Sequence, residues 1–139
     1  MKRGRQIIRD QSGFTLVELL VVIIVLGLLV GLVGPRLWGQ VSKSKQATAR
    51  AQIELLGSSL DQYRLDNGSY PTNLEELQQK PATAANWNGP YLKKDVPLDP
   101  WGRAYVYESP GQHGDYDLYS YGSDGAPGGD SDARDVASW

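Results

Sequence analysis

Four aspartates lie close together near the carboxyl end of the sequence, among residues that allow tight turns. They are Asp124, Asp130, Asp132 and Asp135, within a twelve-residue stretch that also contains three glycines. Calcium takes about six to eight hard oxygen ligands, which carboxylates and backbone carbonyls supply, so a loop of this composition can fold around that ion. The residue order of an EF-hand is absent, and the same residues also fit a hydrated acidic loop. Composition alone leaves both interpretations open.

A single ionisable side chain interrupts the longest apolar run. Glu18 is the fifth residue of the stretch from Phe14 to Gly34, which is otherwise uncharged. A carboxylate at the centre of a bilayer costs about 3 kcal/mol, and less near the interface. Glu18 therefore needs either a partner of opposite charge or a position close enough to the headgroups to stay hydrated, and its spacing does not decide between them.

Other chemistries find little support. The only histidine, His113, has Asp115 and Ser120 nearby but no nucleophile elbow, so a histidine on a surface loop is the better interpretation. There is no P-loop, dinucleotide fingerprint or zinc-binding H-E-x-x-H motif. The absence of cysteine excludes disulfides, and 14 basic against 16 acidic residues leave no basic surface for nucleic acid. The sequence does not predict an enzyme.

The apolar run has the length of a membrane span. Its 21 residues, 14–34, form a helix of about 30 Å at 1.5 Å per residue. No small-residue cleavage pattern follows the run, which disfavours ordinary signal cleavage there. The basic leader, residues 1–13, is expected in the cytoplasm, which sends the polar domain across the membrane and, in a bacterium, into the periplasm.

Helical periodicity continues beyond the span. Ile53, Leu56, Leu60 and Tyr63 recur on one helical face, so residues 35–65 are predicted to form an amphipathic stem whose apolar face is core. Pro35 removes a backbone donor, and a kink or local unwinding is expected between Gly31 and Pro35.

Residues 66–139 have the composition of a small α+β domain. Thr72 and Glu75 predict a capping box for a short helix through Gln79. Aromatic and β-branched residues predict strands at 103–108 and 116–121. The fold class is therefore α+β, with a long amino-terminal helix packed on a small antiparallel sheet.

The start of the apolar run resembles a known processing signal. Gly13-Phe14-Thr15-Leu16-Val17-Glu18, behind a short basic leader, is similar to the class III signal of type IV pilins and type II secretion pseudopilins. The resemblance implies that a prepilin peptidase cuts after Gly13 and methylates the amine of Phe14. It also implies that Glu18 neutralises the terminal amine of a neighbouring subunit during assembly.

Further blocks narrow the resemblance to the major pseudopilins of type II secretion, within the type IV pilin-like family. They are LDNGSYPT at 65–72, GPYLKKDVPLDPWG at 89–102, SPGQHG at 109–114 and YSYGSDG at 119–125. The resemblance implies one structural calcium in a carboxyl-terminal loop, with Asp124 and the Tyr121 carbonyl in matching positions. Asp130, Asp132 and Asp135 are the other candidate ligands, because the loop has a longer GGDSDARDV form here.

The resemblance implies the major structural subunit of a pseudopilus, a periplasmic helical homopolymer that helps to export folded proteins across the outer membrane. The expected partners are the prepilin peptidase, the minor pseudopilins, the inner-membrane assembly platform with its ATPase, the secretin, and membrane lipid before assembly. Two alternatives remain, a type IV pilus subunit and an anchored periplasmic calcium-binding enzyme or binding module. The second alternative gives Gly13, Phe14 and Glu18 no role.

Overall fold

The computed structural model describes residues 13–139, so the leader prediction lies almost entirely outside the described residues. One long helix, α1 (Leu16–Asn67), is followed by a short 3-10 helix η1 (Leu74–Leu77) and strands β1 (Val106–Glu108) and β2 (Asp117–Ser120). A second 3-10 helix, η2 (Ser131–Ala133), precedes strand β3 (Val136–Ala137). The predicted α+β class is confirmed. The chain divides into two compact units, which meet between Trp38 and Gly39 and are described separately.

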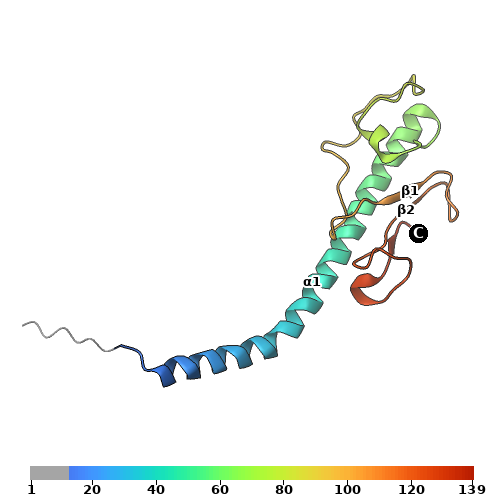
Figure 1. Cartoon of the computed structure of the whole chain (residues 1–139). Helices are drawn as coiled ribbons and strands as arrows, with labels where there is room; N and C mark the ends of the chain where they lie inside the picture. The colour runs from blue at the N-terminus through green and yellow to red at the C-terminus, as the bar shows by residue number, and fades with distance from the viewer. Residues whose placement is uncertain (1–12) are drawn as a thin grey trace, which may run out of the picture. The chain divides into compact units, whose positions relative to one another are not determined.

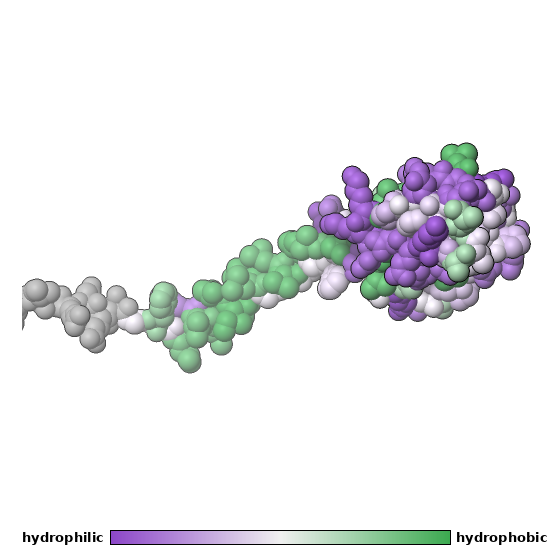
Figure 2. Space-filling model, turned by 90° about the horizontal axis from the view of Figure 1, so that it is seen from above, coloured by the Kyte–Doolittle hydropathy of each residue, from purple (hydrophilic) through white to green (hydrophobic). Residues whose placement is uncertain are grey.

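The first unit contains the apolar part of α1. An 18-residue window of this helix has a mean hydropathy of 3.1 and none of it is buried, which makes α1 the one candidate membrane span among the described residues. Figure 2 shows hydrophobic residues along this part of the chain and mostly hydrophilic residues over the globular part. An apolar surface of this extent requires lipid or other apolar helices around it.

The expected unwinding at Pro35 does not occur. Helix α1 is continuous from Leu16 to Asn67 and includes Pro35. A proline removes one bond, here the bond to the carbonyl of Gly31, while the bonds on either side remain to hold the helix. Residues 14–34 and 35–65, predicted as separate segments, thus share one helix.

The core of the second unit confirms the predicted helical face. Ile53, Leu56, Leu60 and Tyr63 are all buried, with Leu56 and Leu60 fully so. They pack in one cluster with Leu77 of η1, Leu118 of β2 and Val136 of β3. Figure 1 shows β1 and β2 beside the second half of α1, where this cluster forms.

The short helix after α1 differs from the prediction in type and in its cap. It is a 3-10 helix of four residues, and its cap is Asn73, whose side chain accepts a hydrogen bond from the backbone N–H of Glu76 at 3.2 Å. The predicted capping box of Thr72 and Glu75 is therefore wrong by one position. Asparagine and threonine are both residue types that cap helices well, and here the cap is Asn73, the residue directly before Leu74, the first residue of η1.

The sheet is antiparallel with the order β1-β2-β3. Val106 pairs with Tyr119, and Tyr119 pairs in turn with Ala137. Because side chains alternate across a strand, Leu118 and Ser120 are buried on the inner face while Tyr119 lies on the outer face. The observed strands lie within the predicted ranges but are shorter, and β3 was not predicted.

Candidate functional site

The predicted processing site lies just before α1. Gly13, Phe14 and Thr15 have no regular secondary structure. The side chain of Phe14 is 92% exposed, and a Cβ added at Gly13 would have no atom within 4 Å. The peptide bond between Gly13 and Phe14 is therefore exposed and lies outside the helix.

Glu18 has a local partner that the sequence analysis missed. The backbone N–H of Thr15 donates to Oε2 of Glu18 at 3.0 Å, and the N–H of Glu18 donates to Oγ1 of Thr15 at 3.2 Å. These two bonds form a reciprocal capping box, whose signal in the sequence is T-x-x-E. The carboxylate thus lies at the amino end of α1, where the helix dipole favours negative charge.

Two of the four aspartates in the acidic loop accept hydrogen bonds from its backbone. Asp124 Oδ1 accepts a hydrogen bond from the backbone N–H of Ala126 at 3.1 Å. Asp135 Oδ2 accepts from the N–H of Gly128 at 2.9 Å, while its other oxygen, Oδ1, is buried without a hydrogen-bond partner. A buried carboxylate oxygen without a partner is costly, and such an atom commonly marks the place of a water or an ion.

Asp130 and Asp132 are not drawn into the same arrangement. Both side chains are exposed, Asp130 as the residue before η2 and Asp132 within it. Their carbonyls are used instead, accepting from Ala133 and Ser123 respectively. In the described part of the chain, no three His, Cys, Asp or Glu side chains gather into a group able to hold a metal. The fold of the described residues therefore does not bring three of the predicted aspartate side chains together at one point.

Two glycines allow this loop to close on itself. Gly122 and Gly129 have φ values of 75° and 93°. A Cβ at Gly122 would lie 2.8 Å from the carbonyl oxygen of Arg134, and a Cβ at Gly129 would lie 2.5 Å from that of Ala133. The two ends of the loop therefore approach too closely for any side chain at these positions.

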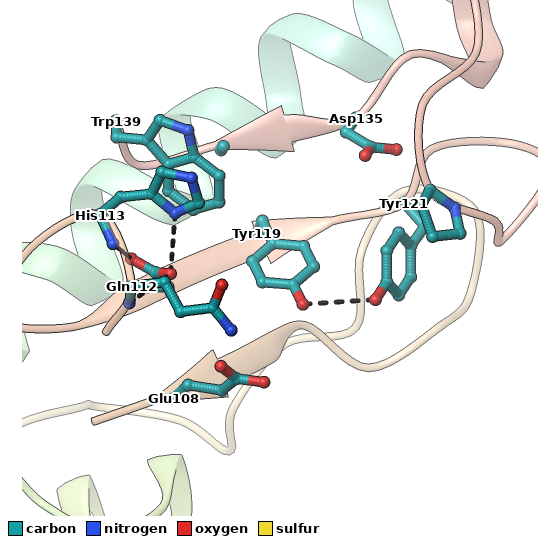
Figure 3. A pocket seen from close by; sticks show the side chains of 10 residues that line it. Glu108, Gln112, His113, Tyr119, Tyr121, Asp135 and Trp139 are labelled. Carbon is teal, nitrogen blue, oxygen red and sulfur yellow. Dashed lines mark hydrogen bonds and ion pairs between the residues drawn. The ribbon is translucent and has the colours of Figure 1, made fainter. Parts of the chain in front are cut away.

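A cavity of about 230 Å³ lies over the outer face of the sheet. Aromatic rings line it in a row: His113 stacks on Trp139 with centroids 3.9 Å apart, and Tyr119 meets Trp139 edge to face at 5.7 Å. Figure 3 shows Glu108 and Asp135 at its borders, with Asp135 near Tyr121 and away from His113. Tyr121 forms a hydrogen bond to Tyr119 with its hydroxyl at 3.3 Å.

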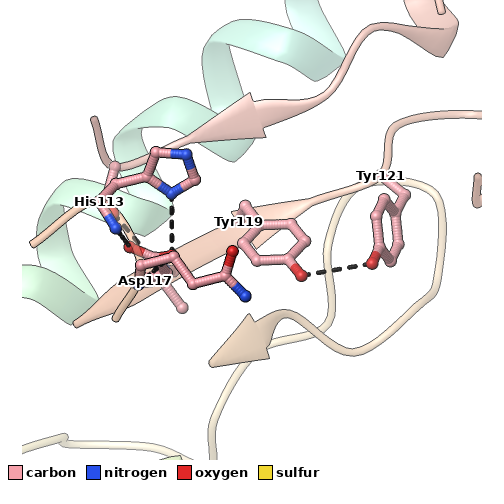
Figure 4. Close-up of polar contacts among 7 residues, drawn as sticks. His113, Asp117, Tyr119 and Tyr121 are labelled. Carbon is pink, nitrogen blue, oxygen red and sulfur yellow. Dashed lines mark hydrogen bonds and ion pairs between the residues drawn. The ribbon is translucent and has the colours of Figure 1, made fainter. Parts of the chain in front are cut away.

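His113 belongs to a structural arrangement rather than a catalytic triad. Its Nδ1 lies 2.9 Å from Oδ2 of Asp117, and its backbone N–H donates to Oδ1 of the same residue at 3.1 Å (Figure 4). Asp115, the neighbour considered from sequence, forms an ion pair with Arg64 at 2.7 Å. The role of Asp117 was not predicted, because only the folded loop brings it to His113.

The carboxyl of Asp117 is held in its charged form. Burial opposes ionisation, but the hydrogen bonds from the His113 side chain and from the backbone N–H groups of Gln112 and His113 outweigh it and lower the pKa of Asp117. The loop needs Gly111 for this, since a Cβ there would lie 2.6 Å from Oδ1 of Asp117. His113 and Asp117 thus fix the SPGQHG loop to the sheet.

Family models of known proteins match both the amino-terminal segment and the folded domain of the chain. The family model "Type II secretion system (T2SS), protein G" matches residues 36–139, and the "Prokaryotic N-terminal methylation motif" matches residues 8–34. "Type II secretion system core protein G" of Pseudomonas aeruginosa is 42% identical over 137 residues, covering 94% of this chain and 96% of the relative. The protein of the same name from Vibrio cholerae is also 42% identical, covering 94% and 93%.

A solved structure has a similar fold. It is the major pseudopilin from the type 2 secretion system of enterohaemorrhagic Escherichia coli, with a TM-score of 0.63 and 35% sequence identity. The similarity covers 76% of this chain and 95% of that one. The long helix and the small antiparallel sheet are therefore shared with a protein of known role.

Proposed function

The chain belongs to the family of type II secretion system protein G, and from this membership we infer that it is the major structural subunit of the type II secretion pseudopilus and not an enzyme. The observation that carries this inference is the family match over residues 36–139, which contain all of the folded core. The methylation motif over residues 8–34 adds the amino-terminal signal of a membrane-anchored secretion subunit.

Polymerisation through the apolar part of α1 is the physical basis of this role. The helix exposes its apolar residues on every side between Leu16 and Val33, so it is stable only in lipid or among other such helices. When a subunit leaves the bilayer, the contacts of this helix with lipid must be replaced by contacts with the helices of neighbouring subunits. Repeated head-to-tail contacts that do not close produce a helical filament, here a homopolymer in the periplasm.

Processing is proposed at the bond between Gly13 and Phe14. The support is the exposed, non-helical backbone at this bond, immediately before α1. A prepilin peptidase would release residues 1–13 and methylate the amine of Phe14. Glu18 of one subunit would then neutralise that amine on a neighbour, which compensates a charge that the apolar surroundings disfavour.

Calcium binding is proposed for the acidic loop, with Asp124 and Asp135 as its carboxylate ligands. The support is the unpartnered buried Oδ1 of Asp135 and the hard oxygen chemistry of the loop. Main-chain oxygens, among them the Tyr121 carbonyl, would complete the ligand set. Asp130 and Asp132 are less suited through their side chains, because both point into solvent. Bound calcium would supply only a fixed positive charge that holds the loop closed.

The partners and the location follow from membership of a multi-subunit secretion system. We propose the inner membrane as the site of the unassembled subunit, with the amino terminus in the cytoplasm, because Lys2, Arg3, Arg5 and Arg9 precede the span. The proposed partners are the prepilin peptidase, the minor pseudopilins, the inner-membrane platform with its ATPase, and the secretin.

Deletion of the gene for this chain tests the function directly. The strain should retain folded type II substrates in the periplasm, and the wild-type gene should restore their export. The matched control is a gene lacking only the codons for residues 14–34, which should not restore export, because the domain then has no helix to polymerise. Normal export by the deletion strain would overturn the proposal.

A further inference from the structure

The turn at Asp99–Arg103 is built around one buried carboxylate. Asp99 is 5% exposed, and its Oδ1 accepts hydrogen bonds from the backbone N–H of Trp101 at 3.1 Å and of Arg103 at 2.8 Å. The backbone closes the same turn, with the N–H of Asp99 donating to the carbonyl of Arg103 at 2.7 Å. The backbone of Arg103 is therefore fixed.

This turn is joined to the beginning of the acidic loop. The other oxygen of Asp99, Oδ2, accepts from the Ser120 hydroxyl at 2.6 Å, and Ser120 Oγ accepts from the N–H of Gly122 at 3.2 Å. Ser120 ends β2 and is fully buried. Two consecutive hydrogen bonds thus connect the buried turn to Gly122, just before the acidic loop.

The side chain of Arg103 makes a second connection to the loop. Its Nη1 donates to the carbonyl of Gly122 at 2.9 Å and to the carbonyl of Ser123 at 3.1 Å. A Cβ at Gly125 would lie 2.7 Å from Nε and 2.8 Å from Cζ of Arg103, so the guanidinium lies directly against this glycine. Residues 122–125 therefore curve around one positive charge, and Asp124 is part of that curve.

We propose that Arg103 is a positioning residue, the built-in cation that folds residues 122–125 before any metal binds. A guanidinium carries several donors in a fixed plane and is always charged, which suits it to holding adjacent carbonyl oxygens together. It does so where the backbone must turn sharply, at Gly122 and Gly125 with φ of 75° and 65°. The guanidinium lies against Gly125, the residue that follows Asp124, so a positive charge stands beside the beginning of the acidic loop.

The contacts of Arg103 limit which loop oxygens can bind calcium. The carbonyls of Gly122 and Ser123 already accept hydrogen bonds from Arg103, so calcium would take oxygens from other residues. Arg103 would then hold the carbonyls of Gly122 and Ser123, while calcium would bind the carboxylates of Asp124 and Asp135 and other main-chain oxygens. Only this second part of the inference rests on the proposed function, because the contacts of Arg103 do not involve a metal.

Amide hydrogen exchange on the full-length chain in detergent micelles tests the proposal. Peptides covering residues 121–129 are compared in chelator and in excess calcium for the wild type and for Arg103→Gln. In chelator, exchange in this region should accelerate by about tenfold or more in the variant, because two charge-assisted hydrogen bonds are lost. Arg103→Lys should give a smaller acceleration, since it keeps the charge but not the planar group.

Arg134→Gln is the matched control. Arg134 lies in the same loop and bears the same charge, but its side chain forms no hydrogen bond or ion pair within residues 13–139. Its substitution should leave exchange at residues 121–129 unchanged. Peptides from residues 53–63 of α1 report on the core and should remain protected in all variants.

Each outcome decides the proposal. If, in chelator, amide exchange at residues 121–129 is as slow in Arg103→Gln as in the wild type, the proposal is overturned. Equal acceleration of this exchange in Arg134→Gln would also overturn it. Loss of protection in α1 of both Arg103 variants would show a general role in folding and also overturn it. If calcium changes nothing in any variant while Arg103→Gln still accelerates loop exchange, Arg103 keeps its role and the calcium proposal fails.

Discussion

The carboxylate of Glu18 lies at the beginning of a helix that is apolar for the following four turns. In the single subunit it caps α1 through Thr15, and in the filament it is proposed to meet the amine of a neighbour. These two roles can be separated experimentally, because glutamine also completes a capping box whereas it carries no charge.

The first prediction concerns Glu18→Gln. The variant should be inserted and processed normally, since the cap and the side-chain shape remain, but filament formation and export should fall by about tenfold or more when the charge pair is lost. Thr15→Ala is the control, which removes the capping hydroxyl and keeps the charge. Export and the yield of sheared filaments measure the effect. Full assembly by Glu18→Gln would exclude the electrostatic role.

The second prediction concerns the orphan oxygen of Asp135. Calcium at a hundredfold excess over its dissociation constant should stabilise the full-length chain by about 2.7 kcal/mol if it binds only the folded state. Asp135→Asn and Asp124→Ala should each remove most of this gain, whereas Asp130→Asn should retain it. Magnesium should substitute poorly, because it demands a smaller octahedral shell. Thermal unfolding in chelator, calcium and magnesium gives the answer, and identical melting temperatures for the wild type in all three would refute calcium binding.

The third prediction concerns acid stability. Because the pKa of Asp117 is lower in the folded state than its ordinary value of 3.8, this carboxylate stabilises the fold above that pH. The contribution is lost as pH falls below 3.8 towards the lowered folded value. His113→Ala removes one cause of the lowering, so its acid unfolding midpoint should move to higher pH. His113→Ala with an unchanged midpoint would show that the backbone N–H groups suffice.

At the scale of elements, α1 serves two environments with one continuous helix. Its second half packs on the sheet through residues that recur every three or four positions, while its first half has apolar residues on all sides. The pattern changes from apolar on all sides to a single apolar face where the candidate membrane span is followed by the folded domain. The boundary between the two compact units, at Trp38 and Gly39, lies close to this change.

The fourth prediction tests the packed half of α1. Leu60→Ala should destabilise the domain by about 2–5 kcal/mol, since Leu60 is 0% exposed and its loss leaves a cavity. Leu65→Ala is the control on the same helix, because Leu65 is 84% exposed and its loss should cost little. Chemical denaturation of the full-length chain in detergent measures both. Equal effects would mean that the helix does not pack through the predicted face.

The helix and the two longer strands could be predicted because their signals are local. The spacing of Ile53, Leu56 and Leu60 specifies a helical face, and aromatic residues with Val106 mark β1. Strand β3 has only two residues and follows the acidic loop, so no periodicity could reveal it. It forms because Val136 completes the core beside Leu118.

The candidate sites were predictable to a different extent. Gly13, Phe14 and Glu18 form a contiguous motif, and Asp124 lies in another. The hydrogen bonds between His113 and Asp117, and those between Arg103 and the carbonyls of Gly122 and Ser123, form only when the intervening turns have folded. A sequence pattern without the fold gives no spacing rule for such contacts.

At the scale of the whole molecule, the chain combines a helix that requires an apolar environment with a domain that is polar on its surface. In the proposed assembly, a membrane would surround the helix before polymerisation, and neighbouring helices would surround it afterwards. The proposed filament is therefore the aqueous alternative to the bilayer for the same apolar surface. Its specificity would come from contacts that repeat in one register, as set in part by Glu18.

Cysteine cross-linking in cells tests this homopolymer most directly, because the chain has no cysteine of its own. One cysteine replaces Leu16 and a second is placed in turn at Leu28, Val30 or Leu32, all well exposed on α1. With the other secretion components present, at least one pair should give a ladder of multimers under oxidation, and Glu18→Gln should shorten it. Single-cysteine variants, the controls, should stop at dimers. Absence of multimers for every pair in cells that export normally would contradict assembly through α1.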